Sequence, residues 1–310
     1  MKSKPIIVGV DGSRESLRAA SLAWRIAQVD DTKYVLVHAV PEVWVPGALE
    51  PLINSAETFE IVVKHVRELL AIELGAEIPT AVLQGLVARP GRPALVLDEV
   101  AREYEAGLIV VGGRRHGALA RGLGGSTAHN LVRTAAAPVL VVEASSRAPL
   151  RVLAATDLTA AAPPTLSTAA RYAELFQAQL GVLHVVEFGA ASPAIPLTLD
   201  MDVLENRSRD ELERLVEAEG VSIAPPDRLL RRGRADEAIA EAAAAWHADL
   251  VVVGSHGRGW LNRMLIGSTT ERLLNRLPAS LLVVPINKPA ARPAVVRPEL
   301  VTKRKGMVVI

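Results

Sequence analysis

The segment "LVVVGSHGRGWLNRMLIGSTTERLL", residues 250–274, places a glycine-rich turn between an aliphatic run and the start of a helical pattern. An uninterrupted aliphatic run is typical of a parallel strand that is buried on both faces. Gly254 ends this run, and Gly257 follows three residues later. Glycines at a strand end permit positive φ and let a ligand approach the backbone. The segment therefore predicts a strand–loop–helix unit of a doubly wound sheet, with a ligand site at the strand end.

The same pattern occurs earlier in the chain. The stretch "LIVVGGRRHG" (residues 108–117) matches "LVVVGSHGRG" (residues 250–259). Asp11 and Asp157 each end the first aliphatic run of their half, and they lie 146 residues apart. Further along, the spacing between matching positions falls to 142, because the first half is four residues longer after its second strand. A repeat of this length predicts two domains with one fold.

Each half alternates short aliphatic runs with longer helical patterns, which predicts an α/β fold with a parallel sheet and right-handed crossovers. We expect one domain over residues 1–146 and a second over residues 147–289. Residues 290–310 have no counterpart in the first half and form a basic, proline-containing tail. Its last residues, "MVVI", offer an edge strand to a partner. If they pair in this way, deleting residues 290–310 changes the size of the oligomer.

Composition narrows the classes of function. The 310 residues carry a formal net charge of +1, which argues against a large nucleic-acid surface. Cysteine is missing, so disulfides and thiolate metal sites are excluded. The first residues lack the apolar core of a signal peptide, and no apolar run reaches the length that crosses a bilayer. We therefore expect a cytoplasmic protein without nucleic-acid or membrane partners.

The helical pattern that begins near Gly267 suits a phosphate. The first N–H groups of a helix have no partner within the helix, and they carry a partial positive charge. Hydroxyl groups of Ser268, Thr269 and Thr270 can add donors. The order Ser-Thr-Thr-Glu, ending at Glu271, also predicts a capping box in which Ser268 caps the helix.

Together these residues form the pattern G-x2-G-x9-G-S, which resembles the phosphate-binding signature of the universal stress protein family. The resemblance covers residues 5–286 and includes the aspartate after the first strand and a histidine within the second. It implies two tandem Rossmann-like domains. Each would have a five-stranded parallel sheet of order 3-2-1-4-5, with helices on both faces. For the ATP-binding members of that family, it implies adenine and ribose beside the first two strands and phosphates at the glycines.

The resemblance carries the ATP site over to this chain position by position. In the second half the implied site comprises Ala155, Asp157, Val185, Val253, Gly254, Gly257, Gly267, Ser268, Thr269 and Thr270. In the first half the corresponding residues are Asp11, Ala39, Gly112, Gly125 and Ser126. There Arg115 replaces the middle glycine and Ala128 replaces Thr270. We therefore expect the second half to bind ATP better than the first.

Several of these residues also have a purely structural interpretation. Asp11 and Asp157 are typical of turns or helix caps at a strand end. His38 and His184 lie inside apolar strands, where we expect buried, hydrogen-bonded histidines rather than catalytic ones. No pair of histidines has the spacing of a metal site.

The resemblance implies an ATP-binding stress-response regulatory module, for which we expect little or slow ATP hydrolysis. No P-loop and no evident general base is present, while Mg²⁺ could bridge the phosphates with few protein ligands. The expected partners are an adenine nucleotide, a second tandem chain and an unknown regulatory protein. A nucleotide-free dimeric scaffold is one alternative, in which the last strands of the two halves pair. A weak ATPase or phosphotransferase is another.

Overall fold

The structure is a computed structural model that describes residues 4–40, 56–113, 127–143, 149–187, 201–255 and 266–286. The first half contains β1 (Ile6–Gly9), α1 (Arg14–Val29), β2 (Tyr34–Val40), α2 (Ala56–Leu74), α3 (Thr80–Gln84), β3 (Val87–Pro90), α4 (Pro93–Glu103), β4 (Leu108–Gly112), α5 (Thr127–Thr134) and β5 (Val139–Val142). The second half contains β6 (Arg151–Thr156), α6 (Ala162–Phe176), β7 (Gln179–Val186), α7 (Met201–Ala218), the 3-10 turn η2 (Pro225–Asp227), β8 (Arg228–Arg232), α8 (Ala235–Ala245), β9 (Leu250–Gly254), α9 (Ser268–Arg276) and β10 (Ser280–Val284).

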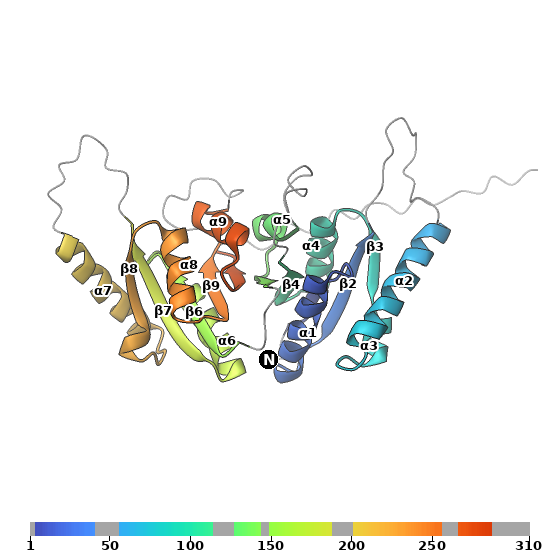
Figure 1. Cartoon of the computed structure of the whole chain (residues 1–310), viewed down its shortest axis with the longest axis horizontal. Coiled ribbons are helices and arrows are strands. Elements are labelled where there is room, and N and C mark those ends of the chain that lie inside the picture. The colour runs from blue at the N-terminus through green and yellow to red at the C-terminus, as the bar shows by residue number, and fades with distance from the viewer. Residues whose placement is uncertain are drawn as a thin grey trace, which may run out of the picture.

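Each half forms the predicted parallel sheet. The strand order is β3-β2-β1-β4-β5 in the first half and β8-β7-β6-β9-β10 in the second, so the order 3-2-1-4-5 is confirmed. The two sheets join where β5 pairs antiparallel with β10, with Leu140 opposite Leu282. Figure 1 shows the two halves side by side along the resulting sheet of ten strands. The last strands of the two repeats therefore pair within one chain.

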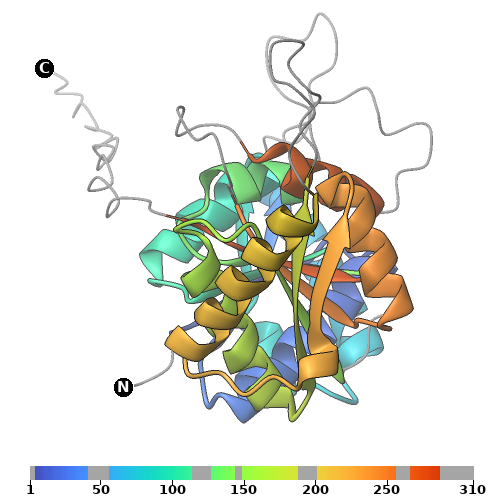
Figure 2. The same cartoon turned by 90° about the vertical axis from the view of Figure 1, so that its left-hand side faces the viewer.

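Helices cover both faces of this sheet. Successive side chains of a strand point to opposite faces, so Ile7 and Val8 of β1 belong to different core clusters. The cluster around Val8 includes residues of α1, α2, α6 and α7, and the cluster around Ile7 includes residues of α4, α5, α8 and α9. Figure 2 shows the end of the second half, with α7 and α8 on either side of the strands. Each cluster runs through both halves, which makes the core continuous across the β5–β10 junction.

The repeat extends to unusual backbone conformations. Asp31 and its counterpart Gln177 both have positive φ, at 44° and 52°. One matching pair differs in residue type, because Gly12 (φ 78°) corresponds to Leu158 (φ 57°). A left-handed backbone at a residue other than glycine costs roughly 1 kcal/mol or more. The turn after β6 is therefore more strained than the turn after β1.

Among the helices that the structure describes, none combines the length and the apolar character needed to cross a bilayer.

Two glycines of the first half should differ in what they contribute to stability. A Cβ atom on Gly112 would lie 2.6 Å from the carbonyl carbon of Glu15 and 2.7 Å from the nitrogen of Ser16. A Cβ atom on Gly12 would meet only the methyl groups of Leu69, at 3.5 Å and 3.7 Å. We expect Gly112→Ala to lower the free energy of unfolding by about 3 kcal/mol, because helix α1 must move. Gly12→Ala should cost about 1 kcal/mol, from backbone conformation alone. Urea denaturation measures both; equal losses would contradict this packing role of Gly112.

Candidate functional site

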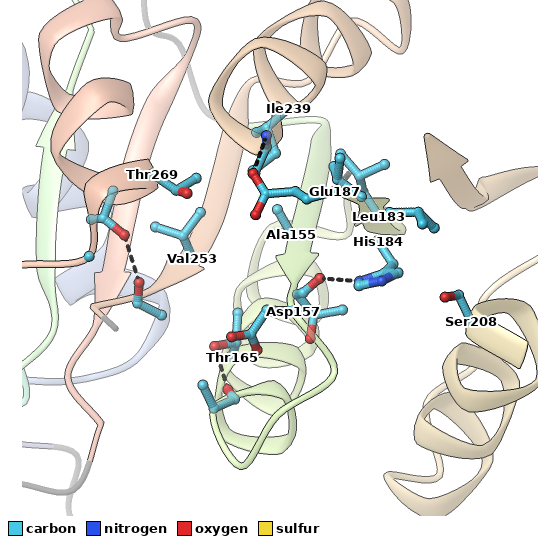
Figure 3. Close-up of a pocket in the computed structure, with 18 of the residues that line it drawn as sticks. Ala155, Asp157, Thr165, Leu183, His184, Glu187, Ser208, Ile239, Val253 and Thr269 are labelled. Carbon is cyan, nitrogen blue, oxygen red and sulfur yellow. Dashed lines mark hydrogen bonds between the residues drawn. The ribbon is translucent and has the colours of Figure 1, made fainter. Parts of the chain in front are cut away.

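The ends of β6, β7 and β9 and the first turn of α9 surround a cavity of about 490 Å³ in the second half. Helix α7 closes it opposite α9, and Figure 3 shows Thr269 and Ser208 on these two opposite sides. The predicted residues that line it are Ala155, Asp157, Val185, Val253, Gly254, Gly267, Ser268, Thr269 and Thr270. A cavity of this size suits a small molecule, and its position at the strand ends is the usual one in doubly wound sheets.

Four positions from the sequence analysis lie outside the described residues. They are Arg115, Gly125, Ser126 and Gly257. Their contribution to either site, like that of the tail over residues 290–310, remains a prediction.

The first turn of α9 has no side-chain cap. Gly267 is the N-cap residue, and its carbonyl accepts the first helical bond from the N–H of Glu271 at 2.9 Å. The predicted capping box is therefore wrong, because Ser268 is already the first helical residue and Glu271 comes one position too late. The helix offers no acceptor to the N–H groups of Ser268, Thr269 and Thr270. With the helix dipole, these three donors make the α9 end of the cavity favourable for an anion.

Thr270 joins the helix to the end of strand β9. Its side chain is buried, and its hydroxyl donates to the carbonyl oxygen of Gly254 at 2.9 Å. A hydroxyl has one proton, so this bond leaves the Thr270 N–H as the donor that a ligand would meet. Ala128 in the first half cannot form the same bond.

Asp157 lies in the turn after β6. Its Oδ1 accepts from the N–H of Thr159 at 3.0 Å and from the Thr159 hydroxyl at 2.7 Å. Its Oδ2 is buried and accepts no hydrogen bond within the part of the chain that the structure describes. An unpaired buried acceptor costs about 1–3 kcal/mol. A ligand hydroxyl that reached Oδ2 would supply the missing donor, and the adjacent left-handed residue Leu158 keeps the carboxylate in this tight turn.

The strand histidines are buried and hydrogen-bonded, as predicted. His38 and His184 are both buried, and their Nδ1 atoms lie 2.7 Å and 2.8 Å from the carbonyl oxygens of Val10 and Thr156. Because a carbonyl can only accept, Nδ1 carries the proton in each ring. His184 also lines the cavity, while its hydrogen bond fixes the orientation of the imidazole.

Sequence reasoning missed the polar side chains that face the cavity from β7 and α7. Glu187 follows β7, and its Oε1 accepts from the N–H of Ala235 at the start of α8, at 2.8 Å. Helix α7 contributes Arg207, Ser208 and Glu211, and Arg207 Nε lies 3.1 Å from Glu211 Oε1. Helix α2 is the counterpart of α7 in the first half. It has apolar residues, Val66 and Leu69, at the positions that correspond to Ser208 and Glu211, so a comparison of the two helices in sequence could have found these two residues.

In the first half, the predicted residues have structural partners. Oδ1 of Asp11 accepts from the N–H of Ser13 at 3.0 Å, and Ser13 caps α1 by accepting from the Ser16 N–H. Ala39 is buried in β2, and Gly112 allows α1 to pack closely against β4. These contacts account for the three described residues without a ligand.

A buried carboxylate connects α8 and α9. Asp236 is 1% exposed and lies 2.9 Å from Arg234 Nη2 and 3.3 Å from Arg272 Nη1. Burial alone would raise the pKa of Asp236, but the hydrogen bond from Arg234 and the charges of both arginines outweigh it and hold the pKa below its usual value. The ion pairs thereby fix the helix whose first turn faces the cavity.

Comparisons with known proteins agree with this fold. The model of the universal stress protein family matches residues 2–143 and again residues 150–285. The chain belongs to the universal stress protein family. It is 32% identical over 296 residues to a universal stress protein of Mycolicibacterium smegmatis, covering 90% of this chain and 96% of that one. It is 30% identical over 300 residues to universal stress protein Rv2005c of Mycobacterium tuberculosis, covering 91% and 97%.

The overall fold also matches a solved structure over nearly the whole length of both chains. A universal stress protein from Archaeoglobus fulgidus superimposes with a TM-score of 0.61 at 20% identity, covering 91% of this chain and 98% of that one. Both repeats of this universal stress protein therefore have the fold expected of the family.

The Thr270 bond predicts a stability difference between two conservative variants. Thr270→Ala leaves the carbonyl of Gly254 without its donor, so we expect the free energy of unfolding to fall by about 1–2 kcal/mol. Thr270→Ser keeps the hydroxyl and should lose less than half as much. Urea denaturation of the two variants measures this difference, and equal losses would show that the methyl group rather than the hydroxyl matters.

Asp236 predicts a dependence of stability on pH. Its folded pKa is lowered, so its stabilisation is complete above the unfolded value, about 3.9, and is lost as the pH falls through the folded pKa. We expect Asp236→Asn to lower the melting temperature at pH 7. The difference in melting temperature between the variant and wild type should narrow as the pH falls below about 4, because the carboxylate takes up a proton more readily in the unfolded chain than in the folded one. Thermal melts from pH 2 to pH 8 test this, and a difference that does not change with pH would contradict it.

Proposed function

We propose that the second half of this universal stress protein binds ATP and that the chain acts as a regulatory module in the stress response. The observation that carries the proposal is the first turn of α9, whose three N–H groups face the cavity without a side-chain cap. A polyanionic phosphate chain suits such a helix end, because the unpaired donors and the dipole both favour negative charge. The phosphates would then lie between Gly254 and Ser268.

The rest of the cavity supports a nucleoside. Ala155, Val185, Val253 and Ile239 give it apolar surface, on which a flat base can pack. Asp157 offers the unpaired Oδ2 acceptor, which suits a ribose hydroxyl. These groups would hold adenine and ribose, while the backbone of Val185 near the end of β7 would meet the edge of the base. The residues present therefore fit ATP.

Binding is favoured over rapid turnover. Arg207 and His184 are the only basic side chains among the described residues of the cavity wall, and the hydrogen bond of His184 restrains its ring. No group of three His, Cys, Asp or Glu residues in the described part of the chain is placed to hold a metal ion. Mg²⁺ would instead bridge the phosphates with a water shell and few protein ligands. We infer little or slow hydrolysis, and a signal that another protein reads.

We place the module in the cytoplasm and expect whole chains to associate further. The β5–β10 pairing uses the last strands within one chain, so β3 and β8 are the outer strands of the sheet. Strand β8 contains Arg228, Arg231 and Arg232, and charged side chains on an outer strand disfavour pairing with another sheet. Association between chains would therefore use a surface other than β8.

One observation favours the alternative of a nucleotide-free scaffold. Three carboxylates, from Asp157, Glu187 and Glu211, line the cavity together with the single guanidinium of Arg207. An excess of negative charge opposes a polyanion unless the phosphates stay at the α9 end or bring a cation with them. The scaffold function therefore predicts that no adenine nucleotide stabilises the protein.

A pair of variants at Ser268 tests the proposal. Proline fits the first helical position and removes one N–H, so Ser268→Pro should keep the fold and weaken phosphate binding. Ser268→Ala removes the hydroxyl and keeps the N–H. ATP present at 100 times its dissociation constant stabilises a protein by about 2.7 kcal/mol. We expect ATP to raise the melting temperature of wild type and Ser268→Ala, and to raise that of Ser268→Pro by less than half as much.

Thermal melts with ATP, ADP, AMP and cyclic AMP measure these shifts. If the rise in melting temperature is largest with ATP, smaller with ADP and smaller again with AMP, the result supports phosphate binding at the first turn of α9. If no nucleotide shifts the wild-type melting temperature, the scaffold function replaces the proposed one.

A further inference from the structure

Helices α2 and α7 are equivalent, but their side chains near the site differ. The buried residues Leu70 and Leu74 of α2 correspond to the buried residues Leu212 and Val216 of α7, each 142 residues further along the chain. The four-residue length difference between the halves therefore precedes these helices. The same spacing relates every position along them, so the two faces can be compared residue by residue.

At this spacing, the polar residues of the α7 wall correspond to apolar residues of α2. Ser208 corresponds to Val66, and Glu211 corresponds to Leu69. Ser208 and Glu211 line the cavity of the second half. Val66 is 8% exposed and belongs to the apolar core of the first half.

Leu69 covers the turn that corresponds to the site. Its two methyl carbons lie 3.5 Å and 3.7 Å from where a Cβ of Gly12 would be, directly after Asp11. The matching turn of the second half holds Asp157 and Leu158, and Glu211 is the residue of α7 that corresponds to Leu69. A carboxylate thus stands in the second half where the first half has an isobutyl group.

We infer that the polar face of α7, formed by Ser208 and Glu211, restricts nucleotide binding to the second half, so that each chain binds one nucleotide. This inference rests on the proposed function. Ser208 and Glu211 accept hydrogen bonds from the hydroxyl groups of the nucleoside, beside Asp157. In the first half, Val66 and Leu69 would cover the same groups without offering any acceptor.

The physical reason is the cost of burying a donor without a partner. A nucleoside brings ribose hydroxyls and an amino group, and these lose their water when they enter a cavity. Hydrogen bonds to an ionised carboxylate are among the stronger ones in proteins. Arg207, 3.1 Å from Glu211 Oε1, helps to orient that carboxylate and leaves its Oε2 to accept from a ligand. Valine and leucine at these positions supply no hydrogen-bond acceptor.

The test is to give α7 the residues that α2 already has. Ser208→Val with Glu211→Leu should fold, because the equivalent helix carries the same residues at the same spacing. We expect isothermal titration with ATP to give one site per wild-type chain. The double variant should bind at least tenfold more weakly, with its melting temperature without nucleotide unchanged or higher. Asp210→Leu is the control, because it also replaces an acidic residue of α7 with leucine. Asp210 is exposed and lies outside the cavity wall, so this variant should bind ATP like wild type.

The outcomes separate this inference from the proposed function. Two sites per wild-type chain, or wild-type affinity in the double variant, would overturn the inference and leave ATP binding intact. If the double variant does not fold, Glu211→Leu alone decides in the same way, with at least a fivefold loss expected. A wild-type chain that binds no nucleotide would overturn the proposed function, and the inference with it.

Discussion

The hydrogen bond from the Thr270 hydroxyl to the carbonyl of Gly254 holds the first turn of α9 against the end of β9. Because Gly267 caps the helix without a side chain, three N–H groups of this turn stay available to the cavity. The ion pair of Asp236 with Arg272 joins the same helix to α8. A rigid helix start with unsatisfied donors is the physical basis of an anion site, since the donors need no rearrangement when the anion arrives.

Duplication gave both halves this framework, and small substitutions then made them different. The strand order, the buried histidines and several left-handed residues match between the repeats. The hydrogen bond of Thr270 and the polar face of α7 are features of the second half. The first half has Ala128, Val66 and Leu69 at the corresponding positions. At the corresponding positions of the first half, apolar side chains pack against the neighbouring elements. Both repeats contribute a strand to the β5–β10 junction, and the cavity described above belongs to the second repeat.

The fold could be predicted well because its signals are local and repeated. Aliphatic runs such as "LVVVG" indicate buried parallel strands, and the constant spacing between matching positions identifies the two equivalent halves. The site was harder to predict. Gly254 ends a strand and Asp157 directly follows one, so their place at the carboxyl end of the sheet could be foreseen. Ser208 and Glu211 enter the cavity through the packing of α7 against the sheet, which no local pattern encodes.

The error at Ser268 has a similar cause. A serine followed three residues later by a glutamate favours a capping box with Ser268 as the N-cap, but the N-cap is the preceding residue, Gly267. The pattern cannot distinguish these two registers, because both give a favourable first turn. That one-residue shift matters for function, since a side-chain cap would have competed with a ligand for the helix donors.

The most direct test is a crystal structure of the full chain grown with a non-hydrolysable ATP analogue. The account predicts electron density for the triphosphate between Gly254 and the first turn of α9, with phosphate oxygens within hydrogen-bond distance of the N–H groups of Ser268 to Thr270. Density for the phosphates at another place, or a second-half cavity filled by the protein's own side chains, would contradict it.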